Sequence, residues 1–114
     1  MTERRVFVVQ VPARRSGARG QWEEKYDLTP AEEFGRLVRV LDYGNVPEDP
    51  TPTRNRMREA MGDFDWEQDY LLLLGDPVAC AQAVAFLTIE VGLASFSTLK
   101  WDRREGRYRE YTVG

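Results

Sequence analysis

The sequence contains no histidine and a single cysteine, Cys80. Histidine is the most common general base near neutral pH and a frequent zinc ligand, so its absence argues against metal hydrolases and the familiar serine and cysteine nucleophile mechanisms. One cysteine cannot form an intramolecular disulfide, and the cysteine content therefore does not indicate export. From this composition we expect no enzymatic activity, no metal and no cofactor.

A large excess of charge of one sign is also lacking. The chain has 16 basic and 19 acidic residues, which gives a net charge of −3. Bulk charge therefore suggests neither a nucleic-acid-binding protein nor an acidic mimic of DNA. The 42% hydrophobic fraction is that of a globular protein. A chain of 114 residues can form one domain with a core that needs no disulfide or metal, and we expect a single domain over residues 1–114.

The N-terminus lacks the pattern of a secretion signal. The charged start, Met1–Arg5, leads into an apolar run, Val6–Val11. That run is too short for the hydrophobic region of a signal peptide. We therefore expect a cytoplasmic location.

A leucine run, Leu71–Leu74, and the apolar segment after it organise the chain. A continuous apolar run is typical of a strand covered on both faces of a parallel or mixed sheet. Gly75 permits a tight turn, Asp76 is a good helix N-cap, and Pro77 suits the first helical position. The sequence therefore predicts a buried strand, a sharp turn and a helix over Val78–Val91.

This expected helix has little polar surface. Only Gln82, Thr88 and Glu90 are clearly polar, whereas a surface helix usually has one apolar stripe and one charged face. The helix could lie at the centre of the fold, at a subunit interface or in a membrane, and Gln82 and Glu90 disfavour the membrane. A domain this small cannot surround a helix on every side, so we expect a homodimer. The residues expected at the dimer interface are Val84, Leu87, Thr88 and Val91.

The first quarter of the chain shows strand and loop patterns. Residues Arg5–Val11 are rich in β-branched side chains and predict the first strand. Residues Ala13–Gly20 carry Arg14, Arg15 and Arg19 among small residues and predict a basic loop. Residues 21–28 alternate in polarity, which suits an extended arm that pairs back on the first strand.

A capping-box pattern at residues 29–32 begins the next part of the chain and predicts a short helix. Residues 37–41 then read as a second strand, and the alternative is one helix over residues 30–41. A further helix is expected to begin at Pro52, with Thr51 as its cap, and to end at Gly62.

The last part of the chain predicts a β-hairpin, with strands Phe96–Trp101 and Arg107–Val113. A right-handed crossover through the apolar helix would lay the first of these strands parallel to the leucine strand. The sequence therefore predicts an α/β domain with a mixed four- or five-stranded sheet, two main helices and a C-terminal β-hairpin.

Four segments resemble a known group of proteins. Residues 5–10, 27–35, 69–77 and 99–103, which include Leu-Leu-Leu-Leu-Gly-Asp-Pro and Leu-Lys-Trp-Asp-Arg, occur in the same order in small hypothetical proteins of tailed bacteriophages and prophages. That group has no established activity, so the resemblance transfers no functional residue. It implies a viral gene expressed in the host bacterial cytoplasm, and it favours a host-directed or replication-associated factor over a metabolic enzyme.

The turn at Gly75 and Asp76 lies where α/β proteins bind ligands, between the carboxyl end of a strand and the N-terminus of a helix. Its backbone amides could hold the phosphate of a small molecule or nucleotide. However, Asp76 as an N-cap would occupy those amides and repel an anion, and the turn has only one glycine. A purely structural turn is the alternative.

Four carboxylates, Asp63, Asp65, Glu67 and Asp69, alternate along the chain just before the leucine strand. In an extended segment they would share one side and could coordinate magnesium or calcium. The spacing lacks the glycine and the terminal glutamate of an EF-hand loop. A solvated acidic linker is the alternative, and the sequence does not decide between the two.

The C-terminal hairpin carries basic residues next to Trp101 and Tyr108, a combination that can track a nucleic-acid strand. The expected nucleic-acid contacts are Lys100, Arg103, Arg104, Arg107 and Arg109, joined by Arg14 and Arg15 if the basic loop lies nearby. Asp102, Glu105 and Glu110 dilute this charge, and cations at a sheet edge also protect against aggregation.

The pattern as a whole predicts a non-enzymatic phage-type accessory protein that acts by binding a macromolecular partner, as a homodimer. A nucleic-acid-binding module that uses the C-terminal hairpin is the first alternative. A small-molecule binder at Gly75 and Asp76 is the second. Cys80 is expected to be a buried small apolar residue and not a reactive thiol.

Overall fold

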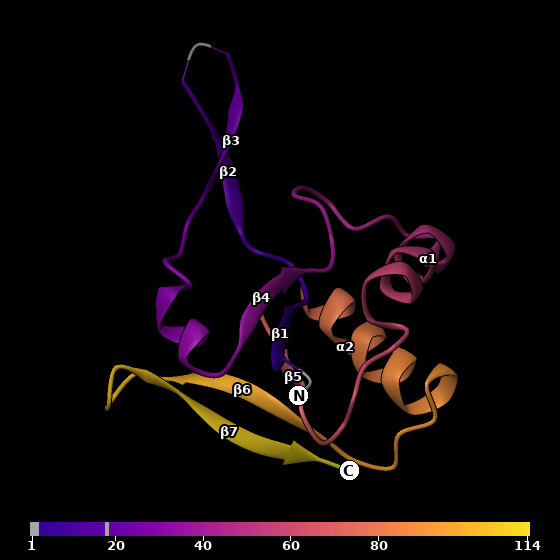
Figure 1. Cartoon of the computed structure of the whole chain (residues 1–114). Coiled ribbons are helices and arrows are strands. Elements are labelled where there is room, and N and C mark those ends of the chain that lie inside the picture. The colour runs from indigo at the N-terminus through magenta and orange to yellow at the C-terminus, as the bar shows by residue number, and fades with distance from the viewer. Residues whose placement is uncertain (1–2, 18) are drawn as a thin grey trace.

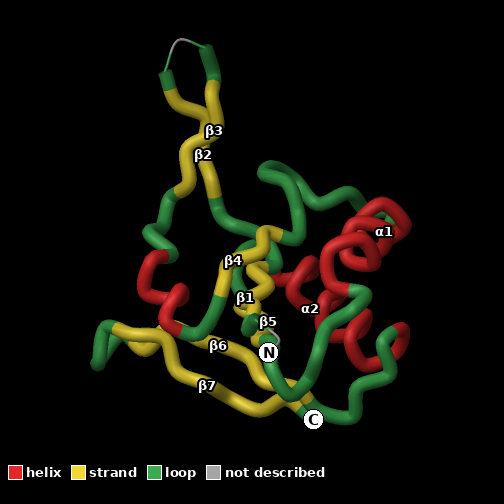
Figure 2. Tube along the Cα trace, in the orientation of Figure 1, coloured by secondary structure: helices red, strands yellow, loops and turns green. Residues whose placement is uncertain are grey.

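The computed structural model describes residues 3–17 and 19–114, which form a five-stranded sheet, a separate two-stranded arm and two helices (Figures 1 and 2). The main strands are β1 (Arg5–Val8), β4 (Arg36–Arg39), β5 (Tyr70–Leu72), β6 (Phe96–Asp102) and β7 (Arg107–Val113), and the arm consists of β2 (Ala13–Ser16) and β3 (Gln21–Glu24). The helical segments are η1 (Thr29–Glu33, 3₁₀), α1 (Pro50–Met61), α2 (Pro77–Ala85) and η2 (Phe86–Glu90), a π-helical continuation of α2. The predicted α/β class, mixed sheet and C-terminal hairpin are confirmed.

The sheet has the strand order β4-β1-β5-β6-β7. The first four of these strands run parallel, and β7 pairs antiparallel with β6. The expected parallel pairing of the leucine strand with the first hairpin strand is present, with Leu71 opposite Thr98. Strand β1 lies in the middle of the parallel part, and its Val6, Phe7 and Val8 are fully buried. A strand covered on both faces needs apolar side chains on both faces, which explains this uninterrupted run.

Helices α1 and α2 cover one face of the sheet (Figure 1). Phe7 and Leu71 point to this side, where Met57 of α1 and the small Ala79 and Ala83 of α2 pack in the same core cluster. Small side chains let a helix lie close to a sheet, so the inward face of α2 excludes water without large residues. Within the described residues, neither helix is long and apolar enough to cross a lipid bilayer.

The opposite face of the sheet has a thinner cover. Val8, Leu72 and Leu99 point to this side, and Ala31 of η1 and the preceding Leu28 pack over them. Figure 2 shows the short η1 turn on the side of the sheet away from α1 and α2. One 3₁₀ turn thus covers a surface that most α/β proteins cover with a full helix.

Three predicted boundaries need correction. The first strand ends at Val8 and not at Val11. The leucine strand ends at Leu72, and Leu73 is partly exposed, because Leu74 and Gly75 already form the turn. Helix α1 begins at Pro50 and not at Pro52, because the side chain of Asp49 caps it by accepting a hydrogen bond from the Thr51 amide at 2.9 Å. These three differences concern the ends of elements and leave their type and order unchanged.

The predicted basic loop is also wrong, because residues 13–16 form strand β2. Strand β3 pairs antiparallel with β2, with Arg14 opposite Glu23, and does not pair with the first strand. The two strands form an arm that projects away from the main sheet (Figure 1). Between this arm and α1, residues 36–39 form strand β4. The predicted strand at residues 37–41 is therefore confirmed, and the alternative of one helix over residues 30–41 is wrong.

Candidate interaction surfaces

The outward side of α2 and its π-helical continuation is apolar. Ile89 is 80% exposed and Val78 is 60% exposed, and the exposed alanines Ala81 and Ala85 lie between them. These four residues, which we call the α2 stripe, recur at helical spacing on one side of the helix. A surface helix normally places charge on this side, so the stripe is unusual for a face in contact with water.

The residues predicted at a dimer interface lie mostly on the inward side of the same helix. Leu87 is fully buried in the core, and Val84 and Val91 are half-buried against it. Thr88 is exposed, but its hydroxyl donates to the backbone carbonyl of Val84 at 3.0 Å. The chain itself covers Leu87, so a second copy cannot contact it. The exposed apolar surface of this helix is therefore the α2 stripe.

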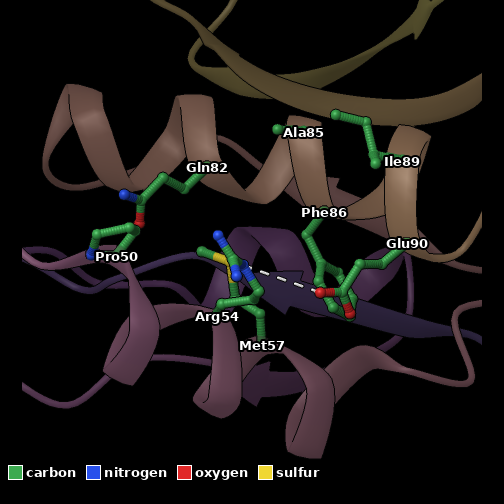
Figure 3. Close-up of a pocket in the computed structure, with 8 residues that line it drawn as sticks. All are labelled: Pro50, Arg54, Met57, Gln82, Ala85, Phe86, Ile89 and Glu90. Atoms are coloured by element: carbon green, nitrogen blue, oxygen red, sulfur yellow. Dashed lines mark ion pairs between the residues drawn. The ribbon is translucent and has the colours of Figure 1, made fainter.

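A groove of about 320 Å³ runs between α1 and α2 beside this stripe (Figure 3). It is lined by Pro50, Arg54 and Met57 of α1 and by Gln82, Ala85, Phe86, Ile89 and Glu90 of the facing helix. At one end, Glu90 binds the guanidinium of Arg58 at 2.8 Å and that of Arg54 at 3.9 Å. The side-chain oxygen of Gln82 is buried and has no hydrogen-bond partner within the described residues.

The predicted ligand turn at Gly75 and Asp76 lies at the switch point of the sheet, where β1 is flanked by β4 and β5. Gln10 fills this position: its amide nitrogen donates to the carbonyls of Asp42 and Gly44 at 3.1 and 2.8 Å, and its oxygen accepts from the Asp76 amide at 3.4 Å. Gly75 has a φ of +102°, and a Cβ there would lie 2.6 Å from the Gln10 carbonyl oxygen. The turn therefore packs directly against the chain, and glycine is required.

The amides after this turn are already occupied as well. The Asp76 carboxylate caps α2 by accepting hydrogen bonds from the Val78 and Ala79 amides at 2.8 and 3.2 Å, so the predicted N-cap is confirmed. The Cys80 thiol is half-buried and donates to the Leu74 carbonyl at 3.6 Å. Burial, with a smaller contribution from the charge of Asp76, raises the pKa of Cys80 above its ordinary value. This geometry favours the structural interpretation of the turn and an unreactive thiol.

The four alternating carboxylates before β5 do not converge on one point. Asp69 is buried and binds the guanidinium of Arg5 at 2.8 Å, while Asp63 binds the same guanidinium at 3.2 Å. Asp65 accepts a hydrogen bond from the Glu67 amide at 2.9 Å. In the part of the chain that the structure describes, no group of three or more cysteine or acidic side chains could hold a metal ion.

The C-terminal hairpin has part of its positive charge neutralised. Arg107 pairs with Glu105 at 2.8 Å, and Arg109 contacts both Asp102 at 3.1 Å and Glu105 at 3.3 Å. Trp101 lies on the same side of the sheet as Leu99 but is exposed, because it lies beyond the cover of η1. The cations of this hairpin without an ion pair in the described residues are Lys100, Arg103 and Arg104.

Arg14 and Arg15, which were expected to extend that patch, lie on β2 in the arm. The arm and the β6–β7 turn point to different ends of the molecule, so the two basic groups do not form one surface (Figure 1). Sequence reasoning missed the arm because its first strand is rich in arginine, a residue with no strong preference for strands. The alternation in residues 21–28 is the available signal for this pairing. It predicts an extended segment beside the first strand, whereas β3 pairs with β2.

Comparison with known proteins places this chain among phage proteins. Searches of curated proteins and of solved structures gave no match. A model of the phage Pam3 gp32-like protein family matches residues 4–114, which is nearly the whole chain. This match agrees with the resemblance to phage proteins seen in the sequence. The chain therefore belongs to the phage Pam3 gp32-like protein family.

Proposed function

We propose that this protein is a phage accessory protein that acts by binding and not by catalysis, and that it works as a homodimer joined through the α2 stripe. The observation that carries the proposal is the exposure of Ile89 and Val78, 80% and 60%, on a helix face without charge. Burial of such side chains contributes about 25 cal/mol per Å² of apolar surface. Family membership supports a role in infected bacteria, and we expect a host-directed or replication-associated partner in the cytoplasm.

The α2 stripe has the symmetry that a two-fold dimer requires. An isologous interface must be complementary to itself. Val78 and Ile89 lie at the two ends of the stripe, with Ala81 and Ala85 between them. If two copies pack antiparallel, Val78 of each copy meets Ile89 of the other. The alanines then meet at the centre, where their small side chains allow close approach.

The groove between α1 and α2 supports the same face as the interface. Ala85 and Ile89 belong to both the stripe and the groove lining. A second copy seated on the stripe therefore also covers the groove beside it. The apolar area removed from water is then larger than the stripe alone provides.

Sedimentation velocity tests this proposal on the full chain and on three variants. The wild type should sediment with twice the chain mass of 13.2 kDa. The double variant Val78→Glu/Ile89→Glu should be monomeric, because antiparallel packing brings like charges together. The double variant Val78→Lys/Ile89→Glu should remain dimeric, because the same packing pairs opposite charges. The matched control is Tyr26→Glu, which alters an exposed side chain in the segment before η1.

Two results would contradict the proposal. The first is a wild type that stays monomeric up to the highest soluble concentration. The second is a Val78→Glu/Ile89→Glu variant that still dimerises. Circular dichroism of each variant should show unchanged secondary structure, since the substituted side chains point to solvent. A wild-type dimer that both double variants dissociate would overturn the antiparallel arrangement, because only antiparallel packing pairs the opposite charges of the Lys/Glu variant.

A further inference from the structure

The arginines of the arm differ from most of those in the domain body in their partners. Most arginines in the body form ion pairs with carboxylates, as Arg5, Arg39 and Arg58 do at 2.7–2.8 Å, whereas Arg103 and Arg104 of the C-terminal hairpin form none within the described residues. In the described residues, the arm arginines Arg14, Arg15 and Arg19 have no carboxylate within ion-pair distance. Residues 13–24 contain these three arginines and two acidic residues, in a chain whose net charge is −3. Glu23 lies opposite Arg14 in the arm, and Glu24 is paired with Arg39 of the body. The arm is therefore net positive, because three arginines outnumber its two carboxylates and one of these is already paired with the body.

Contacts at its base hold the arm in place. Glu24 of β3 accepts hydrogen bonds from Arg39 at 2.7 and 2.9 Å and from the Tyr43 hydroxyl at 2.6 Å. Trp22 packs against Tyr43 with ring centroids 5.8 Å apart. An isolated two-stranded hairpin is only marginally stable in water, so these contacts fix the direction in which it projects. A ligand bound at the arm then meets arginines that are already positioned.

We propose that the arm binds duplex DNA, with the β2–β3 ribbon in the major groove and Arg14, Arg15 and Arg19 on the phosphate backbone. The major groove, about 12 Å wide, admits a two-stranded β-ribbon. Arginine stays charged at all relevant pH values and binds phosphate through paired N–H donors. Outside the arm the chain is acidic on balance, so a projecting arm can contact DNA while the body stays at a distance. This inference does not depend on the proposed dimer.

The packing of Trp22 favours duplex over single-stranded DNA. Single-strand binders usually stack bases on exposed aromatic faces. In the arm, the guanidinium of Arg15 lies 4.6 Å from the centroid of the Trp22 ring, and Tyr43 packs against the same tryptophan. Trp22 is 39% exposed, but Arg15 and Tyr43 both contact its ring, so we expect phosphate contacts to be the main interaction that the arm offers.

Fluorescence anisotropy with a labelled DNA duplex, titrated from about 50 to 200 mM salt, tests the proposal. Each phosphate contact adds about 0.9 to the slope of log affinity against log salt. The variant Arg14→Gln/Arg15→Gln/Arg19→Gln should lower this slope by about 2–3 and weaken binding at low salt by at least about tenfold. The variant Arg14→Gln/Arg19→Gln, which keeps the Arg15–Trp22 contact, should lower the slope by about 2.

The matched control is Lys100→Gln/Arg103→Gln/Arg104→Gln, which removes the same charge from the C-terminal hairpin and should bind duplex like the wild type. If this control and the arm variant lose the same amount of duplex affinity, binding depends on bulk charge and the proposal is overturned. The absence of duplex binding at the lowest salt, or tighter binding to the single strand of the same sequence, would also overturn it. If polyglutamate displaces the labelled duplex as strongly as unlabelled duplex does, the partner of the arm is an acidic protein surface and the proposal is overturned.

Discussion

The buried carboxylate of Asp69 offers the sharpest test of how this domain is held together. Its side chain is inaccessible to water and accepts hydrogen bonds from the Arg5 backbone amide at 3.1 Å and the Asp65 amide at 2.8 Å. It also binds the Arg5 guanidinium at 2.8 Å, and this hydrogen bond is the main cause of a raised pKa for Arg5. Asp69 thereby joins β1 to the segment that leads into β5.

The substitution Asp69→Asn keeps the shape of the side chain and removes its charge. Breaking one partner of a buried ion pair costs about 3–5 kcal/mol. Arg5 also binds Asp63 and keeps some contact with water, so we expect a cost near the lower end, about 3 kcal/mol. A domain of this size is stabilised by about 5–15 kcal/mol in total, so the loss is a large share.

Urea unfolding followed by circular dichroism measures this cost. With a typical slope of about 1–3 kcal/mol per M, the midpoint should fall by about 1–3 M. Asp63→Asn is the control, because it removes the same charge from the same guanidinium but at a carboxylate that is 76% exposed. Exposed ion pairs contribute about 0–1 kcal/mol, so this variant should unfold near the wild-type midpoint.

The reasoning fails if the two variants lose similar stability, or if Asp69→Asn costs less than about 1 kcal/mol.

The same urea-unfolding assay tests whether the acidic segment before β5 binds a cation. If Asp63, Asp65, Glu67 and Asp69 bound magnesium or calcium, millimolar cation would raise the wild-type midpoint through preferential binding to the folded state. We expect the midpoint to stay unchanged when either cation is added.

Two further predictions concern titration. Hydrogen bonds, first from Arg39 and then from Tyr43, lower the pKa of Glu24 in the folded protein below its ordinary value of 4.5. The ionised Glu24 therefore stabilises the arm fully above pH 4.5. This stabilisation is lost as the pH falls through the lower pKa of the folded state. The Trp22 indole NMR signal should therefore shift only below pH 4.5, and a transition above it would contradict this. Burial raises the pKa of Cys80, so its thiol should react slowly with a disulfide reagent at pH 8 in the folded protein and rapidly in the protein unfolded by urea. Equal reaction rates in the two states would refute its burial.

Local patterns determined the elements whose signals lie within a few residues. The turn from Asp76 to Pro77 combined an N-cap with a first-turn proline, and α2 begins there. The C-terminal hairpin followed from two runs of strand-forming residues around Gly106, and β6 and β7 match it closely. Such elements are predictable because the hydrogen bonds that define them join residues close in the chain.

Only the tertiary structure decided the faces and partners of those elements. Leu87 and Ile89 look alike in sequence, yet packing against the sheet buries the first and leaves the second in water. The arm is fixed at its base because Glu24 reaches Arg39, and the acidic segment before β5 is tied to β1 because Asp69 reaches Arg5. These contacts span 15 and 64 residues, so they form only when the whole chain closes on itself. Local composition therefore determined which segments are helix or strand, and long-range packing decided which surfaces remain for a partner.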